Sequence, residues 1–181
     1  GQPATGAATY EEDVDTTIIR VAPVNDAPTV TIAAPFVTNE DTPITLTGIS
    51  FADPDAGNNG VQVTLTIPAG SGALSWTATP FINVDPASTP TNLILNGSYA
   101  AIRDAIAANA LTYIPTPDFN TGTGTISFTA SINDNGNIGG GALTTVAATT
   151  IEVRPVVDIA NDIYVGTEDT QPKRSEPSGF R

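Results

Sequence analysis

Apolar and polar residues alternate along several short stretches of the chain. The alternation is clearest in VQVTLTI (Val61–Ile67) and ISFTASI (Ile126–Ile132), and a shorter case is ITLT (Ile44–Thr47). Successive side chains of a β-strand point to opposite faces, so each stretch is expected to bury one face in a core. Clusters of Gly, Pro, Asn and Asp between the stretches predict turns. Many short strands with frequent turns indicate an all-β protein, an antiparallel Greek-key β-sandwich.

The order of the predicted strands indicates which loops share an end of the sandwich. We call the end where the N-terminal segment arrives the upper end and the opposite end the lower end. A strand at about Thr29–Val37 is expected to run downward, Ile44–Ile49 upward and Val61–Ile67 downward again. Later in the chain, Thr125–Ile132 is expected to run upward and a last strand, about Leu143–Val153, downward to the lower end.

One segment departs from the strand pattern. Residues 98–110 (SYAAIRDAIAANA) are rich in Ala, with Tyr99, Ile102 and Ile106 at helical spacing and Ser98 in position to cap the first turn. The sequence therefore predicts one short helix at an edge or end of the sandwich. Its apolar stripe is interpreted as core rather than as a ligand groove.

A weak internal repeat indicates the domain organisation. TTII at residues 16–19 resembles TTIE at 149–152, and TNEDTP from Thr38 resembles GTEDTQP from Gly166, both after about 130 residues. This period corresponds to one sandwich domain. Residues 1–24 are accordingly predicted to hold the last strand of a preceding repeat, 25–157 one complete domain, and 158–171 the start of the next repeat. The tail at 172–181 (PKRSEPSGFR) differs in composition and is not assigned.

Composition and charge exclude several classes of function. The chain has 6 Lys and Arg against 19 Asp and Glu, a net charge of −13, which disfavours nucleic acid and anionic lipid as partners. Its sequence contains no apolar run long enough to cross a membrane. It also lacks Cys, His and Met, which excludes thiol catalysis, Ser-His-Asp chemistry and a usual zinc site. Asp53 and Asp55 share one loop and lack pocket-forming aromatic neighbours, so a glycosidase is not expected and the protein is predicted not to be an enzyme.

Acidic and amide side chains are predicted to gather at the two ends. Clusters of carboxylate and amide oxygens match Ca²⁺, which takes six to eight oxygen ligands, so we expect a calcium site at each end. The alternative is that Asp, Asn and Gly here only form turns. The predicted upper cluster comprises Asn25, Asp26, Asp53, Asp55 and Asp134, and the lower one Glu40, Asp118, Asp158, Asn161 and Asp162.

These motifs together resemble the cadherin-like repeats of large bacterial RTX-type surface adhesins. The resemblance covers Val24 to about Pro172, and it depends on VNDAP, EDTP, the DPD loop, YIPTPDFNTGTGTISF and DNGNIGGGAL. It implies a cadherin- or immunoglobulin-like sandwich in which Glu40, Asp118 and the linkers share calcium with neighbouring repeats. It also implies that Asp53 and Asp55 receive calcium from the preceding linker. Two departures are that Pro23 precedes VNDAP and that the second linker, DIANDIY, lacks the usual Pro.

The resemblance implies a calcium-stiffened extender module of a tandem-repeat adhesin. Such a module would be extracellular, on the bacterial cell surface, with neighbouring repeats of the same polypeptide as partners and a role in adhesion and biofilm. One alternative is a glycan- or peptide-binding domain, with Trp76 either exposed for stacking or part of the core, and residues 77–93 as the expected ligand loop. The other is a fibre subunit that assembles by strand exchange through Thr16–Val21.

Overall fold

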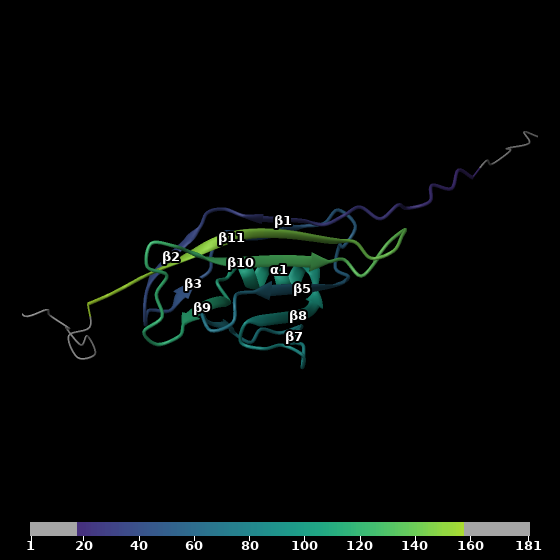
Figure 1. Ribbon diagram of the computed structural model, residues 1–181. Helices are drawn as coiled ribbons and strands as arrows, with labels where there is room; N and C mark the ends of the chain where they lie inside the picture. Colours follow the sequence, from purple (N-terminus) through teal and green to yellow (C-terminus); the bar gives the residue numbers. More distant parts are fainter. Residues whose placement is uncertain (1–17, 158–181) are drawn as a thin grey trace, which may run out of the picture.

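The computed structural model describes residues 18–157, which form a β-sandwich with one short helix (Figure 1). The N-terminal and C-terminal segments of this part leave at opposite ends of the sandwich. Its elements are β1 (Thr29–Ile32), β2 (Phe36–Asn39), β3 (Ile44–Thr45), β4 (Ile49–Ala52), β5 (Gly60–Thr66), β6 (Gly72–Trp76), β7 (Ile82–Val84), β8 (Asn92–Ser98), α1 (Tyr99–Ala107), β9 (Leu111–Pro115), β10 (Ile126–Asn133) and β11 (Thr144–Arg154).

A six-stranded sheet forms one layer of the sandwich. Its strand order is β2-β11-β10-β5-β8-β7, and all its pairs are antiparallel except β2 with β11. The other layer consists of the β1-β4 pair and the three-stranded sheet β3-β9-β6. The all-β sandwich with one short helix predicted from the alternation is confirmed.

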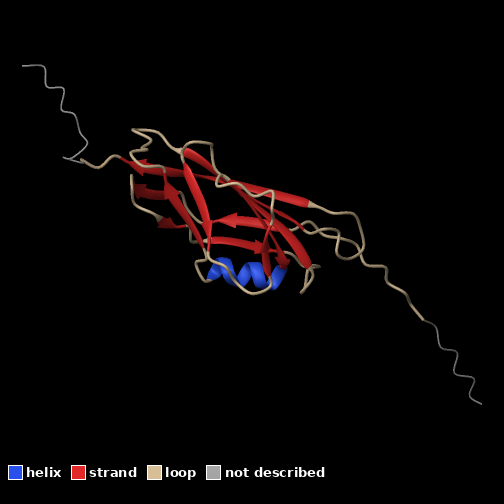
Figure 2. Cartoon of the chain, turned by 90° about the horizontal axis from the view of Figure 1, so that it is seen from below, coloured by secondary structure: helices blue, strands red, loops and turns tan. Residues whose placement is uncertain are grey.

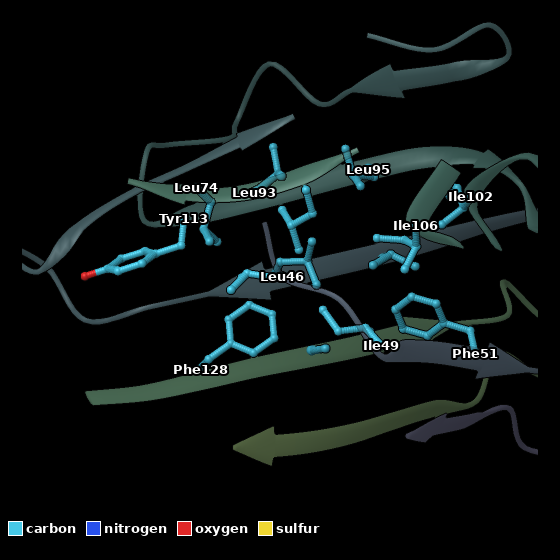
Figure 3. Close-up of a cluster of buried hydrophobic side chains, with 14 of the residues drawn as sticks. Leu46, Ile49, Phe51, Leu74, Leu93, Leu95, Ile102, Ile106, Tyr113 and Phe128 are labelled. Carbon is cyan, nitrogen blue, oxygen red and sulfur yellow. The ribbon is translucent and has the colours of Figure 1, made fainter. Parts of the chain in front are cut away.

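The core lies between the two layers and is built from the apolar face of each strand (Figure 3). Phe128 of β10 is fully buried and meets Phe36 of β2 edge to face, with ring centroids 5.8 Å apart. Tyr113 of β9 is also fully buried, and its hydroxyl donates a hydrogen bond to the Ser71 carbonyl at 2.6 Å. A buried tyrosine is tolerated in this core because its one polar group has a partner.

The strand predicted at about Thr29–Val37 is in fact two strands in different layers. The chain leaves the β1-β4 pair at Ala33 and joins β11 at Phe36. Pro35 lies at the switch, and it has no N–H with which to continue a ladder. The predicted strand Ile44–Ile49 was wrong in the same way, because Gly48 interrupts it with φ of +73° and its carbonyl accepts the Ala33 N–H.

The helix lies beside the strands and contacts β4 of one layer and β8 of the other, so it covers an edge of the sandwich, as predicted (Figure 2). Ser98 caps it by accepting a hydrogen bond from the Ala101 N–H, and Ile102 and Ile106 are buried in the core. Among residues 18–157, no helix has the length and apolarity needed to span a membrane.

The stretch expected to form a ligand loop, residues 77–93, contains secondary structure. It includes β7 and leads into β8, with which β7 forms an antiparallel pair at one edge of the six-stranded sheet. Trp76, at the end of β6, is partly buried and packs against the core, which favours the core interpretation of this residue.

Candidate linker sites at the two ends of the sandwich

The structure joins four of the five predicted upper residues in two pairs, and the fifth, Asp53, lies in the same loop as Asp55. The Asn25 side chain donates from Nδ2 to Asp134 Oδ2 at 2.7 Å and to the Gly141 carbonyl at 3.0 Å. The Asp26 backbone N–H donates to Asp55 Oδ2 at 2.6 Å. Consecutive linker residues are thus held by two loops, β4–β5 and β10–β11, that are distant in the sequence.

Asp134 is the most deeply buried acid of this end, with 1% of its surface exposed. Its Oδ1 accepts the N–H groups of Gly136 and Leu143, both at 2.8 Å, and its Oδ2 accepts the amide of Asn25. Burial raises the pKa of this carboxyl, but the hydrogen bonds it accepts outweigh burial, and the pKa lies below its usual value. Asp134 is therefore a carboxylate that organises its own loop and the linker at once.

Asp53 has one satisfied oxygen and one that is not. Its Oδ1 accepts the N–H groups of Asp55 and Ala56, both at 2.9 Å, which shapes the DPD loop. Its Oδ2 is buried without a hydrogen-bond partner, and so is Oδ1 of Asn25. Asp53 as a whole is only 9% exposed. Buried oxygens of this kind are costly unless something compensates them.

A glycine-rich part of the β10–β11 loop contacts the linker directly. A Cβ atom added at Gly139 would lie 2.4 Å from the Pro23 carbonyl oxygen, and one at Gly140 would lie 2.9 Å from Asn25 Cβ. Gly139 also has φ of +82°, which favours glycine. We call Gly139–Gly141 the linker clamp: Gly139 and Gly140 leave no room for a side chain beside the linker, and the Gly141 carbonyl accepts the Asn25 amide.

Replacing Gly139 with alanine is expected to loosen the linker while leaving the sandwich folded. The new methyl group cannot occupy the space of the Pro23 carbonyl, so the contact must open. Amide hydrogen exchange at Asp26, whose N–H is bonded to Asp55, should become at least about tenfold faster, equivalent to about 1.4 kcal/mol.

Gly122→Ala is the matched control for this change. Gly122 also has a left-handed backbone, with φ of +58°, but a Cβ there meets nothing within 4 Å. Both variants carry the same kind of backbone strain, and only one disturbs the linker. Equal exchange rates at Asp26 in the two variants would contradict a role for the clamp.

The lower end is organised around Glu40. Its Oε1 accepts the Val156 N–H at 2.6 Å and its Oε2 accepts the Asn120 amide at 2.9 Å, so the carboxylate ties the departing chain to the β9–β10 loop. Asp118 belongs to the same loop, and its N–H donates to Asp41 Oδ1 at 3.1 Å. Glu40 and Asp118 are thus brought to one end, as predicted, whereas Asp158, Asn161 and Asp162 lie outside the described residues.

The predicted metal ligands within residues 18–157 do not form a cluster made only of acidic side chains. Within residues 18–157, no three acidic side chains gather into a group that could hold a metal ion. The upper end instead combines carboxylates with the Asn25 amide, and many of the carboxylate oxygens accept N–H groups. Calcium binding therefore stays a prediction.

Three contributors to these ends were missed by sequence reasoning. The clamp glycines were interpreted only as part of a motif, and Asn120 and Asp41 were not assigned at all. Asp41 and Asp118 both adopt left-handed backbone, with φ of 58° and 60°. Asp tolerates left-handed backbone more readily than most residues, but this tolerance does not predict that the Asp118 N–H will donate to the Asp41 side chain.

Comparisons with known proteins found distant structural likeness only. No family model matches the chain, and no curated protein sequence matches it. Among solved structures, AggA, the major subunit of aggregative adherence fimbriae type I from Escherichia coli, shares 16% identity at a TM-score of 0.39, covering 76% of this chain and 100% of its own. A cohesin module of a Clostridium perfringens family 33 glycoside hydrolase has 11% identity, a TM-score of 0.39 and coverage of 73% and 100%. The cohesin–dockerin complex Coh-OlpC-Doc435 of Clostridium thermocellum has 8% identity, a TM-score of 0.39 and coverage of 77% and 100%.

Proposed function

We propose that this domain is an extender module of a bacterial surface adhesin, stiffened by calcium at its linkers. The observation that carries the proposal is the pair of buried oxygens without hydrogen-bond partners, Asp53 Oδ2 and Asn25 Oδ1, at the end where the linker arrives. One belongs to the sandwich and the other to the linker. An ion that needs both would join the two.

Calcium suits this end better than other common metals. The candidate ligands are carboxylate and amide oxygens, and the whole sequence has no Cys or His to favour zinc or copper. Asp53 and Asn25 would offer their free oxygens, with the carboxylates of Asp55 and Asp134 beside them. The bound ion would supply positive charge to a buried carboxylate that otherwise lacks compensation.

The arrangement of the two linkers supports a mechanical role. They leave at opposite ends of the sandwich, and each is tied to it by a carboxylate, Asp55 with Asp26 above and Glu40 with Val156 below. A domain whose two linkers are both hydrogen-bonded to the sandwich transmits tension along its strands and bends little where the linkers meet it. That behaviour is what a spacer between an adhesive tip and a cell requires.

The remaining parts of the proposal follow from the resemblance and the charge. The partners would be neighbouring repeats of the same polypeptide, and the location would be the outer surface of a bacterium. The exposed apolar residues Ile18, Ile19 and Val21, at 73%, 84% and 87%, fit a strand whose sheet belongs to a preceding repeat. A net charge of −13 favours divalent cations over nucleic acid.

Isothermal titration of the chain with calcium tests the proposal. We expect the wild-type protein to bind calcium with Kd in the range of roughly 10⁻⁴–10⁻³ M typical of extracellular modules, and to respond little to magnesium. Asp53→Asn should abolish binding at the upper end, because it removes the charge on the oxygen that lacks a partner.

Asp85→Asn is the matched control for this titration. Asp85 also shapes a turn, but its Oδ1 accepts the Ala87 N–H and its Oδ2 accepts the Asn96 amide, both at 2.9 Å. Asp85 is not among the predicted ligands and neither of its oxygens lacks a partner, so this variant should bind as the wild type does. A wild-type protein that binds no calcium, or an Asp53→Asn variant that binds it unchanged, would refute the proposed site.

A further inference from the structure

A second surface, away from the linker contacts, combines a strained aromatic residue with a hollow. Phe81, in the loop between β6 and β7, is 87% exposed and has φ of +66°. Bulky residues rarely adopt left-handed backbone. Backbone strain of this kind is concentrated at functional sites, and at Phe81 it displays an exposed aromatic ring.

The backbone around Phe81 is held firmly in this conformation. Gly97 of β8 lies directly beneath it, and a Cβ added there would meet the Phe81 carbonyl oxygen at 2.7 Å and Ile82 Cα at 3.3 Å. Ile82 then pairs with Gly97 in the β7-β8 ladder. The glycine thus permits the close approach, and the sheet edge keeps the aromatic ring displayed before any ligand arrives.

The ring borders a hollow of about 430 Å³ lined by Asn58, Phe81, Ser98, Ala100 and Ala101. This volume lies in the range of roughly 300–1,000 Å³ that small-molecule sites occupy. The lining joins three parts of the fold: the β4–β5 loop, the β6–β7 loop and the first turn of α1. Its chemistry is mixed, with one aromatic ring, two alanine methyl groups, one amide and one hydroxyl.

We infer that this hollow binds a neutral sugar ring. A pyranose has an apolar C–H face, which can stack on the electron-rich face of Phe81 beside the alanine methyl groups, and hydroxyl groups, which can bond to Asn58 and Ser98. Ser98 Oγ already accepts the Ala101 N–H at 3.2 Å, so its own proton remains to be donated.

Other ligand classes fit the lining less well. A purely apolar side chain would cover Asn58 and Ser98 without giving them hydrogen-bond partners, which is unfavourable. A cation would find no carboxylate among the five lining residues. An anionic sugar would be repelled by a protein of net charge −13. The inference is independent of calcium, because none of the residues that line the hollow is a proposed ligand.

Titration of the isotopically labelled chain by NMR tests the inference. The probes are the methyl glycosides of glucose, galactose and mannose, and N-acetylglucosamine, each taken into the millimolar range expected for single sugars. At least one should shift the backbone signals of Ala100 and Ala101. An isoleucine-rich peptide and a lysine-rich peptide, titrated in parallel, should not shift them.

Substitution of Phe81 separates a binding role from a structural one. Phe81→Gly removes the ring and relieves the left-handed strain, so we expect a melting temperature several degrees higher and saccharide binding at least tenfold weaker. Phe81→Trp keeps an aromatic face and should keep binding. Val146→Ala, which trims another exposed apolar residue (61%) on the distant strand β11, should change neither binding nor melting.

Each other result overturns the inference. The inference fails if none of the four sugars shifts these signals. It also fails if one of the peptides shifts them and the sugars do not. A lower melting temperature for Phe81→Gly would show that the ring serves the fold. All titrations are run both with calcium and with chelator, and failure of the calcium site would leave the sugar-dependent shifts in place.

Discussion

The Asp53→Asn variant is expected to be at least as stable as the wild type in chelator but less stable than the wild type in calcium. In chelator, the wild type carries a buried carboxylate oxygen without a partner, and the neutral amide removes that charge. The variant should therefore melt at the same temperature as the wild type or higher. In calcium at about 100 times Kd, the wild type should gain about 2.7 kcal/mol in the free energy of unfolding if only its folded state binds the ion, as proposed.

The gain corresponds to a rise in melting temperature of roughly 8 °C for a domain of this size. Differential scanning calorimetry of both proteins, with calcium and with chelator, measures all four values. Asp85→Asn, whose oxygens are both hydrogen-bonded, controls for the loss of one negative charge and should follow the wild type in both conditions. If the wild type melts at the same temperature in chelator as in calcium, calcium has no part in the stability of this domain.

Alternation along the chain predicted most strands of the sandwich because that signal is local. A half-buried strand such as Gly60–Thr66 shows its buried face in its own sequence, where Val61, Val63 and Leu65 are all at most 1% exposed. The helix was predictable for the same reason, since its cap and its apolar stripe lie within a few residues of each other. These elements need no knowledge of their partners to be identified.

The sheet switch near Pro35 could not be predicted from such local signals. Ala33 and Gly48 each interrupt a strand. The two interruptions lie side by side, because the Ala33 N–H donates to the Gly48 carbonyl at 2.9 Å. The sequence around either residue alone remains compatible with one longer strand. Only the packing of the two segments against each other decides where the chain changes layers.

The candidate sites divide in the same way. Acidic residues in the loops at strand ends were predictable as upper or lower, because strand direction alternates along an antiparallel chain. How their oxygens are used was not predictable. Asp55 accepts the Asp26 N–H and Glu40 accepts the Val156 N–H, so carboxylates expected to face metal also hold the linkers directly. Phe81 lies within the expected ligand loop, residues 77–93, but it was not singled out, because nothing in TATPF indicates left-handed backbone at its last residue.

Removal of the Asp134 carboxylate should be among the most damaging single changes in this protein. Asp134→Ala leaves the N–H groups of Gly136 and Leu143 without their acceptor, and it also frees the Asn25 amide. Each buried N–H that loses its partner costs about 1–3 kcal/mol, and partial access of water moderates the sum, so we expect a loss of about 2–4 kcal/mol in the free energy of unfolding. Urea denaturation at neutral pH measures it.

Asp134→Asn is the matched control, because it keeps an oxygen that can accept the two N–H groups but carries no charge. It should lose less stability than Asp134→Ala, and it should also lose one component of the acid sensitivity. The folded-state pKa of Asp134 is lowered, so its contribution to stability is complete above the unfolded value of about 3.9 and disappears as pH falls through the lower folded value. Below about pH 4 the wild type should therefore destabilise more steeply than Asp134→Asn. Identical acid profiles for the two proteins would mean that the loop and the linker are held without help from this charge.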